Sequence, residues 1–187
     1  MTAITIRLID FTAALIGIIV LSPVLLVLTL IGVFDTGSPF FLQSRIGKNQ
    51  KEFTLIKFRT MFLDTPSKGT HEVSSFQVTK YGQFLRRTKL DELPQLWNVL
   101  IGSMSLVGPR PCLPVQIELI QKRNKKGVFN SKPGITGLAQ TKNIDMSTPE
   151  LLALTDAEMI KNWSIQSYFR YIFMTLSGKG QGDAINA

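Results

Sequence analysis

The stretch "FTAALIGIIVLSPVLLVLTLIGVF", residues 11–34, decides where the rest of the chain must lie. It contains 24 residues without a charge, between Asp10 and Asp35. As a straight helix it would be about 36 Å long, more than the roughly 30 Å hydrocarbon core of a bilayer. A cleaved signal peptide fits poorly, because the apolar run is too long and only one arginine precedes it. The sequence therefore predicts a membrane segment.

Ser22 and Pro23 lie near the middle of this segment. Proline lacks a backbone donor and crowds the preceding turn, so we expect a kink there, with the Ser22 hydroxyl bonding a freed carbonyl. One possibility is a single spanning helix. The other is a re-entrant helix that dips into the bilayer and returns to the same face. Arg7 and the basic remainder of the chain both favour the cytoplasmic side, and only the re-entrant helix leaves both there.

Charge is concentrated after the apolar run. The whole chain has a formal net charge of +8, and residues 1–40 contain one arginine and two aspartates. The remaining residues therefore carry +9, which favours an anionic partner such as a phosphorylated substrate, an anionic lipid or nucleic acid. A single cysteine (Cys112) and a single histidine (His71) disfavour a disulfide, a Cys/His zinc site and a Cys–His nucleophile. Carboxylates are then the groups expected to carry any chemistry.

The body of the chain is predicted to be α+β. Two β-rich runs flank the turn-like "GKNQ" at 47–50, which indicates a hairpin. The run "MSLVGPRPCLP" is predicted to be a short strand that ends in a rigid corner, and "SKPGITGLAQT" a loop and strand. Helices are expected from the apolar spacing in four places: after Pro94, in "IELIQKRNKKGVF", over 149–161, and along Ile165, Tyr168, Phe169, Ile172, Phe173 and Leu176.

The last of these helices has two open interpretations. Its apolar face could pack in the core, or it could lie flat in the membrane interface. We predict three parts: residues 1–38 embedded in the membrane, residues 39–178 as a catalytic domain, and residues 179–187 as a disordered tail.

Two adjacent carboxylates, Asp91 and Glu92, precede the helix after Pro94. Capping is the ordinary role of acidic residues at a helix start. Here, however, Arg86 lies just before the pair, Lys57 and Arg59 occur in "IKFRTM", and a further arginine, Arg110, is held between two prolines. A fixed arginine suits bidentate contact with phosphate, and Mg²⁺ prefers one or two carboxylates together with phosphate oxygens. These residues predict phosphoryl chemistry at a membrane.

Nearly the whole chain resembles the monotopic phosphoglycosyl transferases, also called bacterial sugar transferases, in their minimal catalytic form. The resemblance rests on the Ser-Pro pair, on "SPFFLQSRIGKNQKEFTLIKFRTM", "LRRTKLDELPQLWNVLIGSMSLVGPRP" and "KPGITGLAQ", and on "KNWS" before the last helix. The most specific feature is the Asp-Glu pair followed at a fixed distance by Pro-Arg-Pro.

The resemblance implies a reaction and a place for it. Such enzymes transfer a sugar-1-phosphate from a UDP-sugar to a polyprenyl (undecaprenyl) phosphate, release UMP, and use Mg²⁺ and a covalent aspartyl-phosphosugar intermediate. The product is the first lipid-linked intermediate of a surface glycan. A re-entrant helix broken at the Ser-Pro pair would hold the enzyme on the cytoplasmic face of the bacterial inner membrane. The motifs specify neither the sugar nor the oligomeric state.

The resemblance also implies roles for individual residues. Asp91 would be the nucleophile and a metal contact, and Glu92 its partner in proton transfer. The residues expected to hold phosphate or substrate are Arg86, Arg110, Lys57, Arg59 and Gln140. The chain departs from the family at Leu138, where an aromatic residue is common, and at Lys132, where arginine is common.

Two other functions stay open at this point. A membrane-anchored glycosyltransferase would move the sugar without its phosphate and release UDP. A non-catalytic basic protein would bind an anionic surface, although no nucleic-acid motif is visible and we expect no nucleic-acid partner.

Overall fold

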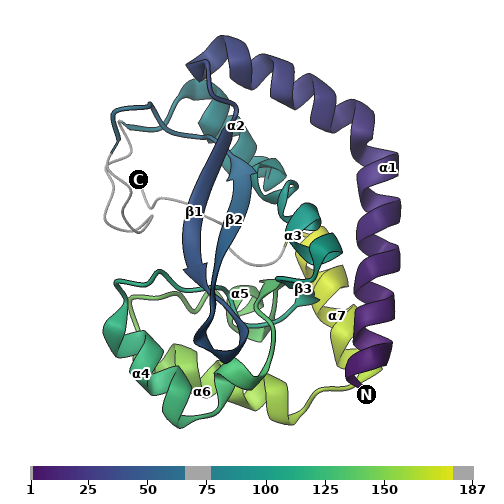
Figure 1. Cartoon of the computed structure of the whole chain (residues 1–187), viewed down its shortest axis with the longest axis vertical. Helices are drawn as coiled ribbons and strands as arrows, with labels where there is room; N and C mark the ends of the chain where they lie inside the picture. Colours follow the sequence, from purple (N-terminus) through teal and green to yellow (C-terminus); the bar gives the residue numbers. More distant parts are fainter. Residues whose placement is uncertain (1, 66–76, 179–187) are drawn as a thin grey trace.

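The computed structural model describes residues 2–65 and 77–178 and has the predicted α+β fold (Figure 1). A long N-terminal helix, α1 (Ala3–Thr36), runs along one side of the molecule and over its top, and a β-hairpin stands at the centre. The remaining helices are α2 (Lys80–Thr88), α3 (Gln95–Ile101), α4 (Ile117–Lys125), α5 (Leu138–Thr141), α6 (Pro149–Lys161) and α7 (Ile165–Leu176). The predicted tail, residues 179–187, and the segment around His71 lie outside the described residues.

Helix α1 is continuous but bends part-way along its length (Figure 1). Pro23 lies inside it and cannot donate to the carbonyl of Ile19. The Ser22 hydroxyl donates to that same carbonyl, at 2.8 Å. This confirms the prediction that the Ser22 hydroxyl bonds a freed carbonyl. That carbonyl lacks its usual backbone donor because proline has no N–H.

The N-terminal end of α1 is bound to the body of the protein by buried polar groups. Arg7 donates to the carbonyls of Val99 and Leu100, at 2.6 and 2.7 Å, at the C-terminal end of α3. The Asp10 carboxylate is buried and accepts from the backbone N–H of Leu106 (2.9 Å) and from the Tyr168 hydroxyl. A cation at a helix C-terminus is favourable, so the arginine also stabilises α3.

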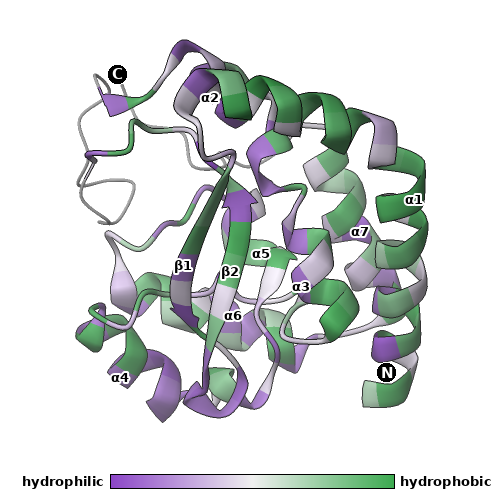
Figure 2. Ribbon diagram, turned by 45° about the horizontal axis from the view of Figure 1, so that its top comes forward, coloured by the Kyte–Doolittle hydropathy of each residue, from purple (hydrophilic) through white to green (hydrophobic). Residues whose placement is uncertain are grey.

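The C-terminal end of α1 is bound to the same body. Asp35 accepts from the Thr79 hydroxyl (2.7 Å), and the Tyr81 hydroxyl donates to the carbonyl of Leu28 (2.7 Å). Between the two ends, many apolar side chains of α1 are exposed, and Figure 2 shows most residues of this helix as hydrophobic. The helix thus lies along the body and does not project from it.

The hairpin and a second, smaller strand pair form the sheets. Strands β1 (Phe40–Ile46) and β2 (Glu52–Phe58) are antiparallel, with Phe40 opposite Phe58 and Ile46 opposite Glu52. The connecting turn contains Asn49 at a positive φ, as tight turns require. Strands β3 (Ser105–Val107) and β4 (Gly134–Thr136) pair in parallel. The predicted hairpin and both predicted short strands are confirmed.

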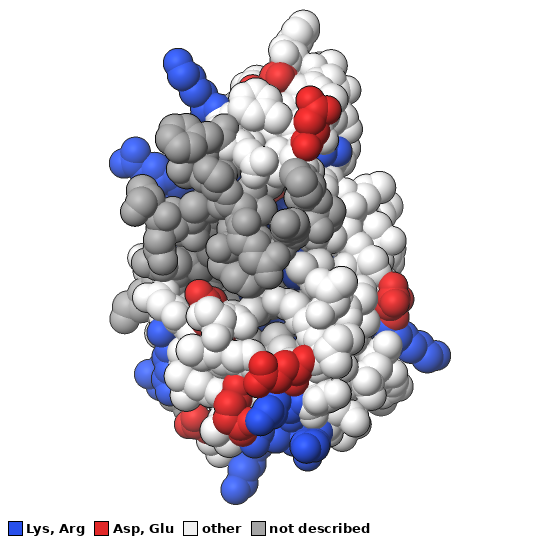
Figure 3. Space-filling view, turned by 90° about the vertical axis from the view of Figure 1, so that its left-hand side faces the viewer, with Lys and Arg blue, Asp and Glu red and all other residues white. Residues whose placement is uncertain are grey.

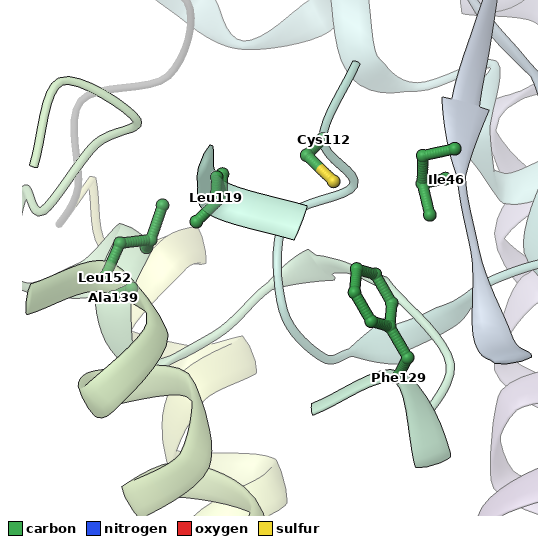
Figure 4. Packing of buried hydrophobic residues seen from close by; sticks show 6 residues of the cluster. All are labelled: Ile46, Cys112, Leu119, Phe129, Ala139 and Leu152. Atoms are coloured by element: carbon green, nitrogen blue, oxygen red, sulfur yellow. The ribbon is translucent and has the colours of Figure 1, made fainter. Parts of the chain in front are cut away.

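The end of the molecule opposite the bend in α1 has its own core and a charged surface. Cys112, Leu119, Phe129 and Leu152 pack together from separate segments (Figure 4). On the outside, Lys122 of α4 and Lys126, which caps that helix, both pair with Glu150 of α6. Figure 3 shows basic and acidic side chains side by side at this end of the molecule. Such exposed pairs contribute little stability, so the buried cluster holds α4 and α6 together.

Helix α7 divides its apolar residues between two environments. Tyr168 is fully buried, and Ile172 packs in the same cluster. Four others, Ile165, Phe169, Phe173 and Leu176, are exposed. The two interpretations of this helix therefore apply to different residues: one row packs in the core, and the other forms an outward apolar surface that suits a membrane interface.

Candidate active site

The two carboxylates lie in a turn between α2 and α3. Helix α2 ends at Thr88 and is capped by Lys89, which has a left-handed backbone (φ 58°). Residues Leu90–Glu92 then form a 3₁₀ turn before α3. Helix α3 begins at Gln95, directly after Pro94, as predicted; the missing N–H of proline costs no hydrogen bond at a helix start. Asp91 is 2 % exposed, whereas Glu92 is only partly buried. The Asp91 carboxylate is therefore shielded from solvent more than that of Glu92.

Asn98 fastens α3 to the hairpin. Its side-chain amide donates to the Thr54 carbonyl (2.7 Å) and accepts from the Ile56 N–H (3.0 Å), so it pairs with β2 as a neighbouring strand would. Asn98 is 1 % exposed, and an unpaired amide there would be costly. The helix that follows the carboxylates is thus fixed against β2, a contact that helical periodicity did not reveal.

Arg110 reaches the acidic pair from the Pro-Arg-Pro corner. Its Nη2 lies 2.9 Å from Glu92 Oε1, and both side chains keep some exposure, at 26 % and 11 %. The structure therefore brings together two of the residues that the resemblance implicated, across 18 positions of sequence. An arginine paired in this way can exchange part of its contact for a phosphate oxygen.

The backbone of the corner is held at each of its carbonyls. The Pro109 carbonyl accepts from the Gly134 N–H (3.0 Å), that of Arg110 from Arg123 Nη1 (2.8 Å), and that of Pro111 from Arg45 Nη1 (2.9 Å). Prolines supply no donors of their own, so these outside donors determine where the corner lies. The sequence did not single out Arg45 or Arg123 as donors to the corner, because neither residue is next to the corner in the sequence.

Arg123 is itself fixed by a buried carboxylate. Its Nε and Nη2 donate to Asp156 Oδ2 at 2.9 and 2.7 Å, and the two side chains are 2 % and 0 % exposed. Burial raises the pKa of Asp156, and the Arg123 guanidinium opposes that rise. The chain of contacts from Asp156 through Arg123 to the backbone of Arg110 positions an arginine that touches Glu92.

Two glycines allow the corner to approach β4 closely. A Cβ on Gly134 would lie 2.0 Å from the backbone nitrogen of Gly108, which no real side chain tolerates. The close approach of the two backbones lets the Gly108 N–H donate to the Thr136 carbonyl at 2.8 Å. The glycines in "LVGPRP" and "KPGITG" thus set the spacing between the two loops.

A small pocket beside the acidic pair is lined by three cationic side chains. Arg45, Lys57 and Arg110 border it, and Gln95, the first residue of α3, completes its polar lining. Lys57 and Arg45 are both buried. Three cations around one pocket create a positive potential that attracts anions, while the pocket itself, at about 10 Å³, has room for about one water molecule.

Lys89 adds a titratable cation at the edge of the site. Burial lowers the pKa of Lys89; the Glu92 carboxylate raises it again, and Arg110 lowers it further. The direction means that this ammonium loses its proton at a lower pH than an exposed lysine would.

The other residues implicated by the resemblance contact backbone carbonyls and a hydroxyl around the site. Arg59 donates to the carbonyls of Ser38 and Phe40, at 2.9 and 3.2 Å, and so holds the start of β1. Arg86 is buried and donates to the Thr60 hydroxyl (2.9 Å). Gln140 Nε2 lies 3.5 Å from the carbonyl of Gly108, just before the corner. These contacts support the walls of the site, and direct phosphate binding by the three residues stays a prediction.

The acidic pair suits a magnesium ion that shares its shell with substrate. Within residues 2–65 and 77–178, no group of three or more His, Cys, Asp and Glu side chains could enclose a metal. Mg²⁺ is commonly bound by one or two carboxylates, with water and phosphate oxygens completing the octahedron. Asp91 and Glu92, beside a cationic pocket, supply that donor set, and magnesium binding stays a prediction.

Comparison with known proteins identifies the family of this chain. The profile described as "Bacterial sugar transferase" matches residues 1–180. The chain belongs to the bacterial sugar transferase family. The sugar transferase EpsL of Bacillus subtilis is 38 % identical over 171 residues, which cover 91 % of this chain and 84 % of EpsL.

Two longer members of the bacterial sugar transferase family have names that state a substrate. The UDP-galactose-lipid carrier transferase of Erwinia amylovora is 33 % identical over 187 residues, covering 91 % of this chain. The UDP-glucose:undecaprenyl-phosphate glucose-1-phosphate transferase of Xanthomonas campestris pv. campestris is 36 % identical over 177 residues, covering 89 % of this chain. The matches cover only 39 % and 37 % of those two relatives.

Proposed function

We propose that this protein transfers a sugar-1-phosphate from a UDP-sugar to a polyprenyl phosphate at the cytoplasmic face of the membrane. The observation that carries the proposal is the contact between Glu92 and Arg110, next to Asp91 and beside a pocket with three cations. The names of the relatives supply the substrate class, and the carboxylates and cations supply suitable chemistry.

The reaction exchanges one phosphoric anhydride for another. In the first step an Asp91 carboxylate oxygen attacks the phosphorus that carries the sugar, the bond to the UMP oxygen breaks, and UMP leaves with the electron pair. In the second step a phosphate oxygen of the polyprenyl phosphate attacks the same phosphorus and frees the Asp91 carboxylate. A covalent intermediate lets one site serve both partners in turn.

The residues around the pair have distinct tasks in this scheme. Glu92 accepts a proton from the incoming lipid phosphate when that phosphate arrives as a monoanion. Arg110, Lys57 and Arg45 bind the phosphate oxygens and offset the repulsion between anionic substrates and the carboxylates. A magnesium ion held by Asp91 and substrate oxygens would neutralise part of the negative charge on the phosphates.

The attachment of α1 supports a re-entrant topology. A straight spanning helix would carry one end across a core of about 30 Å. Here Asp10 binds β3 and α7, while Asp35 binds the start of α2, so both ends contact one folded body. A helix that keeps both contacts enters and leaves on the same face, and its exposed apolar side lies in the bilayer.

The activity is tested by incubating purified protein with Mg²⁺, a panel of UDP-sugars and polyprenyl phosphate. We expect UMP release that depends on the lipid for repeated turnover, and a lipid-linked product that retains both phosphates. Release of UDP would instead indicate a glycosyltransferase. Absence of both nucleotides, with salt-sensitive binding to anionic surfaces, would indicate a non-catalytic protein.

The topology is tested by cysteine labelling in intact cells. Cys112→Ser removes the one native cysteine, and a new cysteine replaces Thr2, the residue that caps α1. We expect a membrane-impermeant reagent to label this position only after the cells are opened. Labelling from outside would show a spanning helix and would leave the proposed reaction intact.

A further inference from the structure

Two cationic side chains meet at the end of α3 that is farther from the acidic pair. Asp91 and Glu92 precede α3, whereas Gly102 caps its last turn. A Cβ placed on Gly102 would lie 3.3 Å from Arg7 Nη2 and 3.4 Å from Lys132 Nζ. The two nitrogens are therefore less than about 7 Å apart, and the point that both approach is open because glycine has no side chain.

Capping of α3 accounts for Arg7 but not for the Lys132 ammonium. Arg7 donates from Nη1 and Nη2 to two carbonyls near the C-terminal end of α3, which uses two of its five N–H groups. Lys132 is half-buried, and within residues 2–65 and 77–178 its ammonium makes no hydrogen bond or ion pair. The three donors of a half-buried ammonium need an acceptor, and that acceptor must come from outside this part of the chain.

The charges around Lys132 leave this place positive. Burial lowers the pKa of Lys132; Arg7 lowers it further, Asp10 raises it, and Lys48 lowers it. The Asp10 carboxylate already accepts from the Leu106 N–H at 2.9 Å. Three cations and one carboxylate leave a net charge of +2, which a bound anion would offset.

The cations lie at the depth of the lipid headgroups if α1 is embedded as proposed. The uncharged run begins four residues after Arg7, which is at most about 6 Å along a helix, and the headgroup layer of each leaflet is roughly 5–7 Å thick. The Arg7 guanidinium also lies over the ring of Phe11, 5.7 Å from its centroid. Phe11 and Leu8 are exposed, so the cations border the apolar surface that α1 presents to the bilayer.

We propose that Arg7 and Lys132 bind the phosphate group of an anionic phospholipid from the surrounding bilayer. A phosphate has several acceptor oxygens, so it can contact both cations at once over Gly102. The positive surroundings favour a lipid with a net negative charge over a zwitterionic lipid, whose ammonium group would meet the same cations. The bound lipid joins the N-terminal end of α1 to the loop before β4. Such a site is independent of sugar-phosphate transfer but requires α1 to lie in the bilayer.

Native mass spectrometry of the detergent-solubilised protein measures this lipid binding. Phosphatidylglycerol and phosphatidylcholine are titrated separately, and the first bound lipid gives a Kd for each. We expect the Kd for phosphatidylglycerol to be at least about tenfold lower, because two cations attract its net negative charge. Equal affinities for the two lipids would overturn the proposal.

Matched lysine variants locate the site. Lys132→Gln removes the ammonium beside Gly102, Lys132→Arg keeps the charge there, and Lys125→Gln removes an exposed ammonium from α4 with the same change in net charge. We expect Lys132→Gln to raise the Kd for phosphatidylglycerol about tenfold, because one charge-assisted contact is lost, and the other two variants to stay within about twofold of wild type. An unchanged Kd in Lys132→Gln, or an equal loss in Lys125→Gln, would overturn the site.

A free phosphate ion offers the same acceptor oxygens, so its binding is tested separately. Excess inorganic phosphate is added to the complex with phosphatidylglycerol. We expect the lipid to stay bound, because its hydrocarbon chains also contact the exposed apolar side chains of Leu8 and Phe11. Displacement of the lipid by phosphate would show a site for free anions and would overturn the assignment to a lipid.

Thermal unfolding in nanodiscs tests the site in a bilayer. A ligand that binds only the folded protein raises its Tm. We expect wild type and Lys125→Gln to unfold at a higher temperature in nanodiscs that contain phosphatidylglycerol than in nanodiscs of phosphatidylcholine alone. This difference should be smaller for Lys132→Gln. An equal difference in all three proteins would contradict a site at Lys132.

The outcomes separate the lipid site from the proposed reaction. If phosphatidylglycerol binds selectively and Lys132→Gln weakens that binding, yet no nucleotide is released with any UDP-sugar, the lipid site stands and the proposed reaction fails. If UMP is released normally and Lys132→Gln binds phosphatidylglycerol as wild type does, the lipid site is overturned and the reaction stands.

Discussion

Two arginine–carboxylate pairs meet at the Pro-Arg-Pro corner, and their side chains differ in access to solvent. Arg110 and Glu92 are 2.9 Å apart with exposed fractions of 26 % and 11 %. Arg123 and Asp156 are 2.7 Å apart with exposed fractions of 2 % and 0 %. The two pairs are joined, because Arg123 also donates to the Arg110 carbonyl.

The difference shows how one kind of contact serves two purposes. Arg123 uses Nε, Nη1 and Nη2 on protein acceptors, so it fixes a backbone position. Arg110 keeps part of its surface open, so a phosphate oxygen can reach it. The buried pair positions the backbone of the corner and adds little net stability. The open pair is available to bind phosphate.

The largest expected effect on activity comes from changes in the acidic pair, whose Glu92 belongs to the more exposed ion pair. We predict that Asp91→Asn lowers the rate of UMP release at least 10³-fold, because an amide oxygen cannot form the acyl phosphate. Glu92→Gln should also be severely impaired. Thermal unfolding should show that both variants stay folded. A near-normal rate for Asp91→Asn would end the covalent mechanism.

Removing the carboxylate of the buried Arg123–Asp156 ion pair should mainly affect stability. We predict that Asp156→Ala lowers the free energy of unfolding by about 3–5 kcal/mol, because the Arg123 charge is left buried and uncompensated. Chemical denaturation of the purified protein in lipid nanodiscs measures this. A loss below about 1 kcal/mol would show that solvent reaches the pair.

A double variant then separates folding from positioning. Arg123→Met with Asp156→Leu replaces the pair by apolar groups of similar size, so most of the lost stability should return. The Arg110 carbonyl still lacks its donor, so the rate of UMP release should stay reduced about tenfold. Recovery of both properties would mean that the buried pair has no positioning role.

A smaller effect is expected when Arg110 keeps its charge but loses its shape. We predict that Arg110→Lys lowers kcat/KM about 10- to 100-fold, because lysine cannot contact Glu92 and phosphate with one planar group. Steady-state kinetics with UDP-sugar measure this. Equal activity would show that only the charge matters and that the corner is structural.

The smallest effect concerns the pH dependence set by Lys89. Because burial lowers the pKa of its ammonium, the cation is lost as pH rises through that lowered value. Activity that needs the charge should therefore decline on the alkaline side, and Lys89→Arg, which stays protonated, should move that decline to higher pH. The pH profile of kcat/KM checks this; an unchanged alkaline limb would show that Lys89 does not contribute.

Deprotonation of Lys89 also affects how the free energy of unfolding depends on pH. The folded pKa of Lys89 lies below the unfolded one, so between the two values the unfolded chain binds more protons. Stability should therefore rise slightly with pH through that window, while activity falls. The opposite slopes distinguish a loss of phosphate binding from unfolding.

The sequence by itself determined the local structure and the kind of chemistry. An uncharged run with a central Ser-Pro pair predicts a bent membrane helix, because helix length, the missing proline donor and the nearby hydroxyl are local properties. Two β-rich runs around a turn-like segment likewise predicted the hairpin, Pro149 marked the start of the helix over 149–161, and helical spacing predicted the last helix. The family resemblance, read from motifs, brought the acidic pair and Arg110 into one site.

Only the tertiary structure decided what holds that site in place. Arg45 lies 66 residues from the Pro111 carbonyl it binds, and Asp10 lies 96 residues from the Leu106 N–H. No periodicity links such partners, because their contact depends on how the elements pack. Burial of Asp91, the roles of Arg123 and Asp156, and the pocket lined by three cations arise in the same way. Local patterns follow from dihedral and spacing preferences along the chain, whereas these contacts follow from packing of segments far apart in sequence.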